Sequence, residues 1–180
     1  TDTFASPQNL FNVTRNFAFV GLVALGMTVV IISGGIDLSV GSVMAVAGAL
    51  APIIFLSQWA VANPGLGLVA SIVLPLLAAA CCGLFNGMLI ARLGVQPIIA
   101  TLIFFISGRG IAQVLTNGNL QTFANPDFTW LGTGRILGFP VQGWLALALT
   151  LVLALVVRKT IYGRYLLSVG LPFEQWLHNL

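Results

Sequence analysis

The fold of this chain is decided around residues 34–42, which read Gly34-Gly35-Ile36-Asp37-Leu38-Ser39-Val40-Gly41-Ser42. This short stretch lies between two long apolar runs, and it holds one of only four carboxylates in the chain. Its glycines permit a tight and irregular backbone, because glycine adopts conformations that other residues avoid. Irregular backbone at membrane depth survives only where it is buried in protein or lines water. We therefore expect the stretch to face protein or a cavity rather than lipid.

The composition of the chain indicates a membrane protein. Of its 180 residues, 58% are hydrophobic and 6% are charged, whereas a soluble domain typically carries roughly 25% charged residues. The seven Lys and Arg residues are scattered, so the chain lacks the basic patch that nucleic-acid binding requires. Cys81 and Cys82 are adjacent within an apolar run, and we interpret them as packing residues rather than as metal ligands or a disulfide framework.

Five apolar segments have the length and composition of membrane-spanning helices. We expect these spans at about residues 16–33, 41–58, 67–91, 97–115 and 142–157. Residues 1–16 are expected to form an interfacial lead-in to the first span, and residues 59–66 a short loop that turns at Asn63-Pro64-Gly65. The predicted fold class is all-α, a polytopic transmembrane helical bundle.

The basic residues predict how the spans are oriented, because Lys and Arg in short loops accumulate on the cytoplasmic side. Three of them place the end of the fifth span inside the cell: Arg158, Lys159 and Arg164. Alternation then puts Arg92 inside and residues 34–42 near the cytoplasmic end of the first two spans. The 59–66 turn and the 116–141 loop are expected outside.

The 116–141 loop is the longest segment that is too polar to face lipid. Two interpretations remain open for it. The first, which we favour, is an ordered connector with Trp130 at the membrane interface. The second is a docking surface for an external partner.

Polar residues inside the apolar runs are candidates for function. Arg109 lies about two-thirds of the way along its span, and burying an Arg at the centre of a helix costs roughly 2.5 to 3.5 kcal/mol on insertion scales. It either faces a cavity or partner, or reaches the outer interface or helix-end carbonyls. Asp37 or Ser39 could cap the second span by accepting bonds from its free N–H groups. Asn86, within the small-residue spacing of Gly83–Gly87, could bridge packed helices.

No catalytic constellation is present in the sequence. The only histidine, His178, lies three residues from the end, and a phosphate-binding loop of Walker type is absent. The four carboxylates are far apart in the predicted topology: Asp2, Asp37, Asp127 and Glu174. We therefore expect a protein that is not an enzyme on its own and that needs no metal and no cofactor.

The signature of a known family is visible around the opening stretch. Residues 26–42 read Gly26-Met27-Thr28-Val29-Val30-Ile31-Ile32-Ser33-Gly34-Gly35-Ile36-Asp37-Leu38-Ser39-Val40-Gly41-Ser42. This segment resembles the signature of permease subunits of bacterial monosaccharide ABC importers, of the ribose, arabinose, xylose and galactose or galactofuranose type. Further matches follow in order: Asn86-Gly87 before Arg92, Pro97-Ile98-Ile99-Ala100-Thr101-Leu102, Gly108-Arg109-Gly110, Thr116-Asn117-Gly118 and Thr160-Ile161-Tyr162-Gly163-Arg164-Tyr165.

The resemblance implies a ten-span permease of the bacterial inner membrane that dimerises with an identical or different permease subunit. It also implies an ATP-binding cassette subunit on the cytoplasmic face, where ATP is hydrolysed, and a periplasmic sugar-binding protein that delivers the cargo. The cargo would be a pentose or hexose, and transport would proceed by alternating access.

On this interpretation we assign residues to roles. Arg109 and Asn86 are candidates for the substrate pathway or for polar packing contacts. The structural signature residues are Gly34, Gly35, Asp37, Ser39 and Gly41. The candidates to face the ATPase are Arg158, Lys159, Gly163, Arg164 and Tyr165.

The chain departs from this family in its extent. The resemblance covers roughly residues 1–170, which would be spans two to six, whereas residues 171–180 do not match the expected continuation. Because the chain begins at Thr1, we expect its natural start upstream. Two alternatives stay open: a truncated permease that only assembles with partners without transporting, and an importer of a furanosyl signal molecule or a nucleoside.

Overall fold

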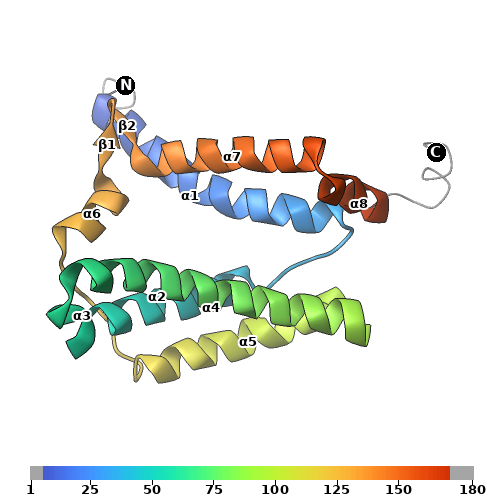
Figure 1. Cartoon of the computed structure of the whole chain (residues 1–180), viewed down its shortest axis with the longest axis horizontal. Helices are drawn as coiled ribbons and strands as arrows, with labels where there is room; N and C mark the ends of the chain where they lie inside the picture. Colours follow the sequence, from blue (N-terminus) through green and yellow to red (C-terminus); the bar gives the residue numbers. More distant parts are fainter. Residues whose placement is uncertain (1–5, 171–180) are drawn as a thin grey trace. The chain divides into compact units, whose positions relative to one another are not determined.

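The computed structural model of the chain describes residues 6–170. In this range the chain is almost entirely helical, as the predicted all-α class requires, with one small β-hairpin (Figure 1). In chain order the elements are α1 Pro7–Ile32, α2 Val40–Phe55, α3 Gln58–Ala62, α4 Pro64–Leu93, α5 Pro97–Leu115, α6 Pro126–Thr133, β1 Arg135–Ile136, β2 Phe139–Pro140, α7 Val141–Lys159 and α8 Ile161–Gly170.

They form two compact units, one from Thr1–Gly35 with Asn125–Leu180 and the other from Ile36–Ala124. The tail at 171–180 lies outside the described residues.

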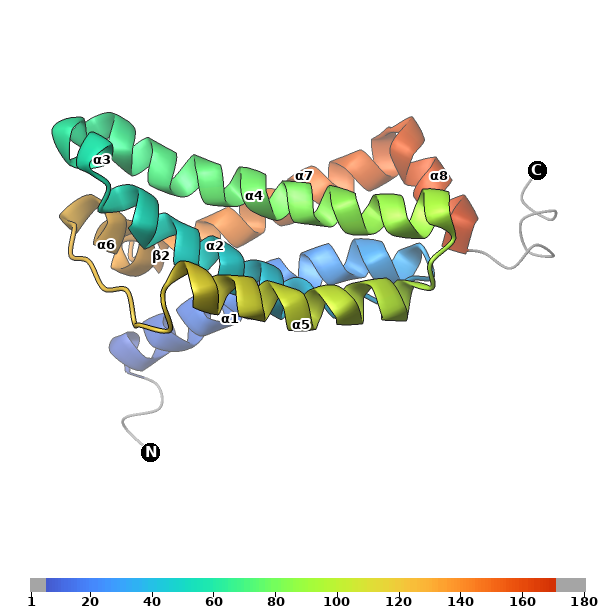
Figure 2. The same cartoon turned by 90° about the horizontal axis from the view of Figure 1, so that it is seen from below.

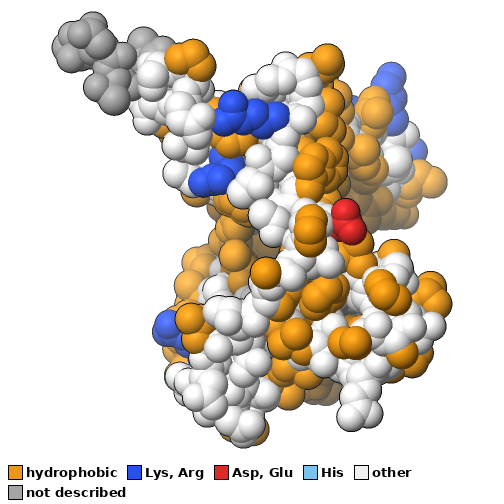
Figure 3. All heavy atoms as spheres, turned by 90° about the vertical axis from the view of Figure 1, so that its left-hand side faces the viewer, with side chains coloured by type: hydrophobic (Ala, Val, Ile, Leu, Met, Phe, Trp, Pro, Cys, Tyr) orange, Lys and Arg blue, Asp and Glu red, His pale blue; other side chains and the backbone are white. Residues whose placement is uncertain are grey.

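Four of the described helices are long and apolar enough to cross a membrane, namely α1, α4, α5 and α7. Helix α2 is equally apolar but has only 16 residues. Each of these five helices overlaps one of the five predicted spans, and the bounds of the spans within the membrane stay a prediction. Their outward side chains are apolar, with Val114 76% and Leu84 74% exposed. Such a surface along the helices suits lipid rather than water. Figure 3 looks instead at the helix ends and connecting loops, where hydrophobic side chains are mixed with polar groups and several Lys or Arg side chains.

Helix α1 begins nine residues before the predicted span, so residues 7–15 are helical and continuous with it, and their interfacial position stays a prediction. The reason is a local start signal, because the Ser6 hydroxyl accepts a hydrogen bond from the Asn9 N–H at 3.2 Å and Pro7 occupies the first turn. The predicted 59–66 loop likewise contains a short helix, α3, which Ser57 caps in the same way.

The 116–141 segment is an ordered connector that contains α6 and the β-hairpin. Asn125 caps α6 by accepting from the Phe128 N–H at 3.0 Å. The hairpin pairs Arg135 with Pro140, and its two turn residues, Leu137 and Gly138, both have positive φ angles, +53° and +79°. Two-residue hairpin turns of this kind match the natural twist of the strands. The alternative role of the segment as a docking surface stays a prediction.

In the unit that holds both chain ends, α1 packs against α7, and α8 contacts both helices (Figure 2). The hairpin is tied to the beginning of α1, because the Arg135 guanidinium lies 3.8 Å from the centre of the Phe11 ring and donates to the Gln8 Oε1 at 2.8 Å. Trp144 connects α7 to the hairpin by donating its ring N–H to the Ile136 carbonyl at 3.1 Å. The connector is therefore fixed to the first turns of both long helices.

In the unit formed by residues 36–124, α2 packs against both α4 and α5. The buried α2 residues follow one helical face: Ser42, Val46, Ala49 and Pro52. Helices α2 and α5 approach each other closely, because a Cβ added to Gly108 would lie 3.0 Å from the Ser42 Cβ. Small residues at helix contacts of this kind are typical of membrane proteins, because they allow the two backbones to approach.

Replacing Gly108 with leucine should therefore destabilise the unit. The side chain has no room against Ser42, and overpacking of this kind typically costs about 1–3 kcal/mol. The melting temperature of the purified protein in detergent should fall. The matched control is Gly110→Leu, because Gly110 has no atom within 4 Å of its would-be Cβ. Equal melting temperatures for the two variants would contradict the close packing of α2 on α5.

Candidate functional site

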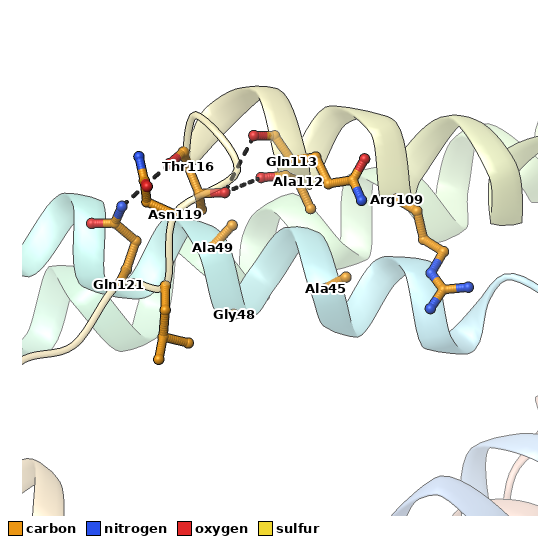
Figure 4. Close-up of a pocket in the computed structure, with 10 residues that line it drawn as sticks. Ala45, Gly48, Ala49, Arg109, Ala112, Gln113, Thr116, Asn119 and Gln121 are labelled. Atoms are coloured by element: carbon orange, nitrogen blue, oxygen red, sulfur yellow. Dashed lines mark hydrogen bonds between the residues drawn. The ribbon is translucent and has the colours of Figure 1, made fainter.

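A groove of about 360 Å³ lies between α2 and α5, within the unit formed by residues 36–124 (Figure 4). Its volume is within the range of roughly 300–1,000 Å³ that is usual for small-molecule sites. The lining residues are Ala45, Gly48 and Ala49 of α2, Arg109, Ala112, Gln113 and Thr116 around the end of α5, and Asn119, Leu120 and Gln121 of the following loop. The groove thus has a floor of small residues and a predominantly polar wall.

Helical spacing explains why these residues share one groove. Arg109, Gln113 and Thr116 follow the i, i+4, i+7 pattern, which places them on one face of a helix. The α2 residues that they face carry at most a methyl group. Because the floor has no long side chains, space remains between the two helices beside the buried cluster of Val46, Ala49 and Ala112.

The backbone after α5 turns back over the groove. Asn117 and Gly118 both adopt positive φ angles, +50° and +69°, and this reverses the chain direction. The Gln121 Nε2 then donates to the Thr116 carbonyl at 3.4 Å, and the same carbonyl accepts from the Asn119 N–H at 3.0 Å (Figure 4). These bonds hold Asn119 and Gln121 at the end of the groove.

The polar groups of the groove are one cation and several neutral amides. Arg109 is exposed, and its Cζ lies 5.4 Å from the centre of the Phe105 ring. At this distance the ring faces the cation favourably. The amides of Gln113, Asn119 and Gln121 each offer both donors and an acceptor. Such a wall, set over a small apolar floor, suits a compact molecule that carries hydroxyl groups on an apolar ring.

Asn86 belongs to a different place in the same unit. It is buried on α4, and its Nδ2 donates to the Ser39 Oγ at 3.3 Å. The Ser39 hydroxyl in turn donates to the Asp37 Oδ1 at 2.6 Å. Asn86 is not among the residues that line the groove, so the structure does not bring it together with Arg109. The observed bond fits the polar bridge between helices, and a pathway role for Asn86 stays a prediction.

The signature residues shape the backbone before α2. Gly34 has a φ of +77°, and the Gly35 N–H bonds back to the Val30 carbonyl at 3.0 Å, which ends α1. Asp37 accepts from the Ser39 N–H at 2.7 Å, whereas the Ser39 side chain makes no capping bond to α2. The prediction that Asp37 or Ser39 accepts from the free N–H groups of the helix is therefore wrong in detail. Asp37 instead orders the residue that precedes the first turn.

The five candidates to face the ATPase lie around the corner between α7 and α8. Thr160 is extended there and interrupts the helix, and its Oγ1 accepts from the Gly163 N–H at 3.3 Å. A Cβ on Gly163 would collide with the Val157 carbonyl oxygen, so the corner requires glycine at this position. Arg164 and Tyr165 follow on exposed positions of α8, and Arg158 and Lys159 end α7.

Comparison with known proteins identifies the class. The family model described as "Branched-chain amino acid transport system / permease component" matches residues 9–174. The chain belongs to this family of permease components. Together with the four apolar helices, this makes it part of a multi-pass protein of the inner membrane. No solved structure matches the chain.

Individual relatives are sugar permeases. The chain is 40% identical over 168 residues to the galactofuranose transporter permease protein YtfT of Escherichia coli, covering 93% of the chain and 46% of the relative. It is 41% identical over 157 residues to the fructose import permease protein FruF of Bifidobacterium longum, covering 85% and 42%. Against the ribose import permease protein RbsC of Bacillus subtilis it is 38% identical over 175 residues, covering 93% and 51%. The chain therefore spans about half the length of these relatives.

These names confirm the resemblance to monosaccharide ABC permeases, and they describe permeases rather than catalytic subunits. Sequence reasoning identified Arg109 but missed the other groove residues. The spacing of Arg109, Gln113 and Thr116 was a visible signal for the α5 face. Nothing in the sequence indicated that the loop returns to add Asn119 and Gln121.

The hydrogen bonds of Asp37 lead to a test of its role. Asp37→Ala removes the acceptor for Ser39 and should destabilise the protein by about 1–2 kcal/mol. Asp37→Asn keeps an acceptor oxygen and should retain most of that stability. Melting temperatures of the two purified variants measure the difference. If Asn costs as much as Ala, the negative charge itself matters, and the proposed ordering role is wrong.

Proposed function

We propose that this chain is part of the transmembrane subunit of an ATP-driven ABC importer that moves a monosaccharide across the inner membrane. The observation that carries this proposal is the set of relatives named for galactofuranose, fructose and ribose transport, at 34–41% identity. The cargo would be a pentose or a hexose. The groove between α2 and α5 would form part of the path that the sugar follows.

The chemistry of the groove supports this assignment. A sugar ring has an apolar face of C–H groups and a rim of hydroxyls that both donate and accept hydrogen bonds. The floor of Ala45, Gly48 and Ala49 is small and apolar, and the amides of the wall can exchange both kinds of hydrogen bond. The contacts are few, which suits a path from which the cargo must also leave.

We further propose three protein partners, because ABC permeases work with an ATPase and a substrate-binding protein. These are a cytoplasmic ATP-binding cassette subunit, a periplasmic sugar-binding protein and a second permease subunit. The corner between α7 and α8 is the proposed contact for the cassette subunit. Its support is the cluster of exposed residues of the corner, Arg158, Lys159, Arg164 and Tyr165, around a turn that Gly163 keeps tight.

Uptake measurements test the proposed function. Deleting the native gene that contains this chain should abolish energy-dependent uptake of one labelled sugar among galactofuranose, fructose, ribose and arabinose. Restoring the gene should restore that uptake. Unchanged uptake of every monosaccharide in the deletion strain would overturn the proposal.

In the restored strain, Arg109→Ala should lower sugar uptake by about tenfold, which corresponds to ~1.4 kcal/mol of lost stabilisation along the path. Ser107→Ala is the matched control, because Ser107 is exposed on the same helix, bonds only to its own helix at Ile103 and does not line the groove. Membrane levels of both variants are measured by immunoblot. Full uptake by the Arg109 variant at normal levels would remove Arg109 from the path.

Gly163→Ala should also abolish uptake, because the added methyl group cannot fit against the Val157 carbonyl and the corner must open. Sugar binding by the periplasmic protein should stay intact. Ser168→Ala on the same helix is the control, since its hydroxyl bonds only to the Tyr165 carbonyl. Wild-type uptake by the Gly163 variant would show that the shape of this corner is not needed for coupling.

A further inference from the structure

The groove between α2 and α5 carries a charge that its own lining does not neutralise. Arg109 is the one charged residue among the described residues that line it. The other polar contributors are an alcohol and three neutral amides: Thr116, Gln113, Asn119 and Gln121. No carboxylate is part of this lining, so any molecule that occupies the groove meets a net positive charge.

The surroundings of Arg109 preserve this charge. Its guanidinium lies near the face of Phe105, 5.4 Å from the ring centre, and an aromatic ring stabilises the cation without cancelling its charge. Arginine also stays protonated in proteins at every physiological pH. The floor of the groove is apolar, and charges interact more strongly beside apolar protein than in bulk water.

We propose that Arg109 makes this groove a charge filter, which admits neutral and anionic sugars and disfavours cationic ones such as protonated amino sugars. The inference rests on the proposed function, since it takes the groove to be part of the sugar path. A neutral sugar meets no repulsion beside the guanidinium, and its oxygens can accept hydrogen bonds from it. A sugar acid gains an attraction there, and an ammonium group meets like-charge repulsion.

Charged thiol reagents measure the electrostatic potential of the groove without relying on transport. In the native gene product, every native cysteine, Cys81 and Cys82 among them, is replaced by serine, and Ala45→Cys then supplies a single thiol on the groove floor (Figure 4). Membranes are labelled with an anionic and a cationic methanethiosulfonate of similar size. The ratio of the anionic to the cationic labelling rate is then compared between the protein that keeps Arg109 and its Arg109→Gln and Arg109→Lys variants.

The ratio should fall about tenfold in Arg109→Gln, equivalent to ~1.4 kcal/mol, and should be kept in Arg109→Lys. Val61→Cys on α3 supplies the control thiol, because Val61 is 67% exposed and does not line the groove, and the ratio there should not change. An unchanged ratio at the groove thiol would overturn the filter. This is the result expected if the Arg109 guanidinium reaches the membrane surface instead of the groove. An equal fall at the control thiol would also overturn it, because the effect would then belong to the whole surface.

Protection by sugars separates this inference from the proposed function. The transported monosaccharide should slow labelling of the groove thiol in the Arg109 protein, and less strongly in the Arg109→Gln variant, which lacks the stabilisation that Arg109 gives to the sugar. Its protonated 2-amino analogue should protect about tenfold better in Arg109→Gln. Absence of protection by any monosaccharide would overturn the groove as part of a sugar path. Protection by the neutral sugar without improved protection by the amino sugar would overturn the charge filter alone.

Discussion

The close contact between Ser42 of α2 and Gly108 of α5 constrains how these two helices meet in the unit formed by residues 36–124. Both residues are buried, and Gly108 lacks the side chain that would separate the two backbones. The α2 residues that follow are small, and a groove remains beside this contact. Arg109 follows Gly108 directly, so the residue that permits the contact also sets the position of the charge. Packing and chemistry are therefore specified by two neighbouring residues.

Much of the helical architecture could be predicted from apolar length alone. The span predicted at 97–115 coincides with α5, since Pro97 begins it and the turn at Asn117 ends it. The predicted helix boundaries differ from the observed ones where the hydroxyl of a short side chain caps the start of a helix, as Ser6 does for α1 and Ser57 for α3. Each of these caps contributes a single hydrogen bond, which a search for long apolar runs does not detect.

The candidate site was less predictable than the fold. Arg109 was found because a charge inside an apolar helix is costly and therefore conspicuous. The amides that accompany it lie in a polar loop, where such residues are ordinary, and only the reversal at Asn117 and Gly118 brings them to α5. Asn86 and Arg109 were paired by their shared polarity, although the structure assigns them to different contacts. Sequence position alone does not tell which helix face meets which neighbour.

The brevity of α2 has a consequence for the surrounding lipid. Its 16 residues extend about 24 Å at 1.5 Å per residue, whereas the hydrocarbon core of a bilayer is about 30 Å thick. A lone helix of this length would thin the bilayer around it, at a cost for each ångström of mismatch. Contact with the longer helices α4 and α5 shields α2 from the acyl chains along part of its surface. The packing of the unit formed by residues 36–124 should therefore be less sensitive to acyl-chain length than an isolated α2 would be.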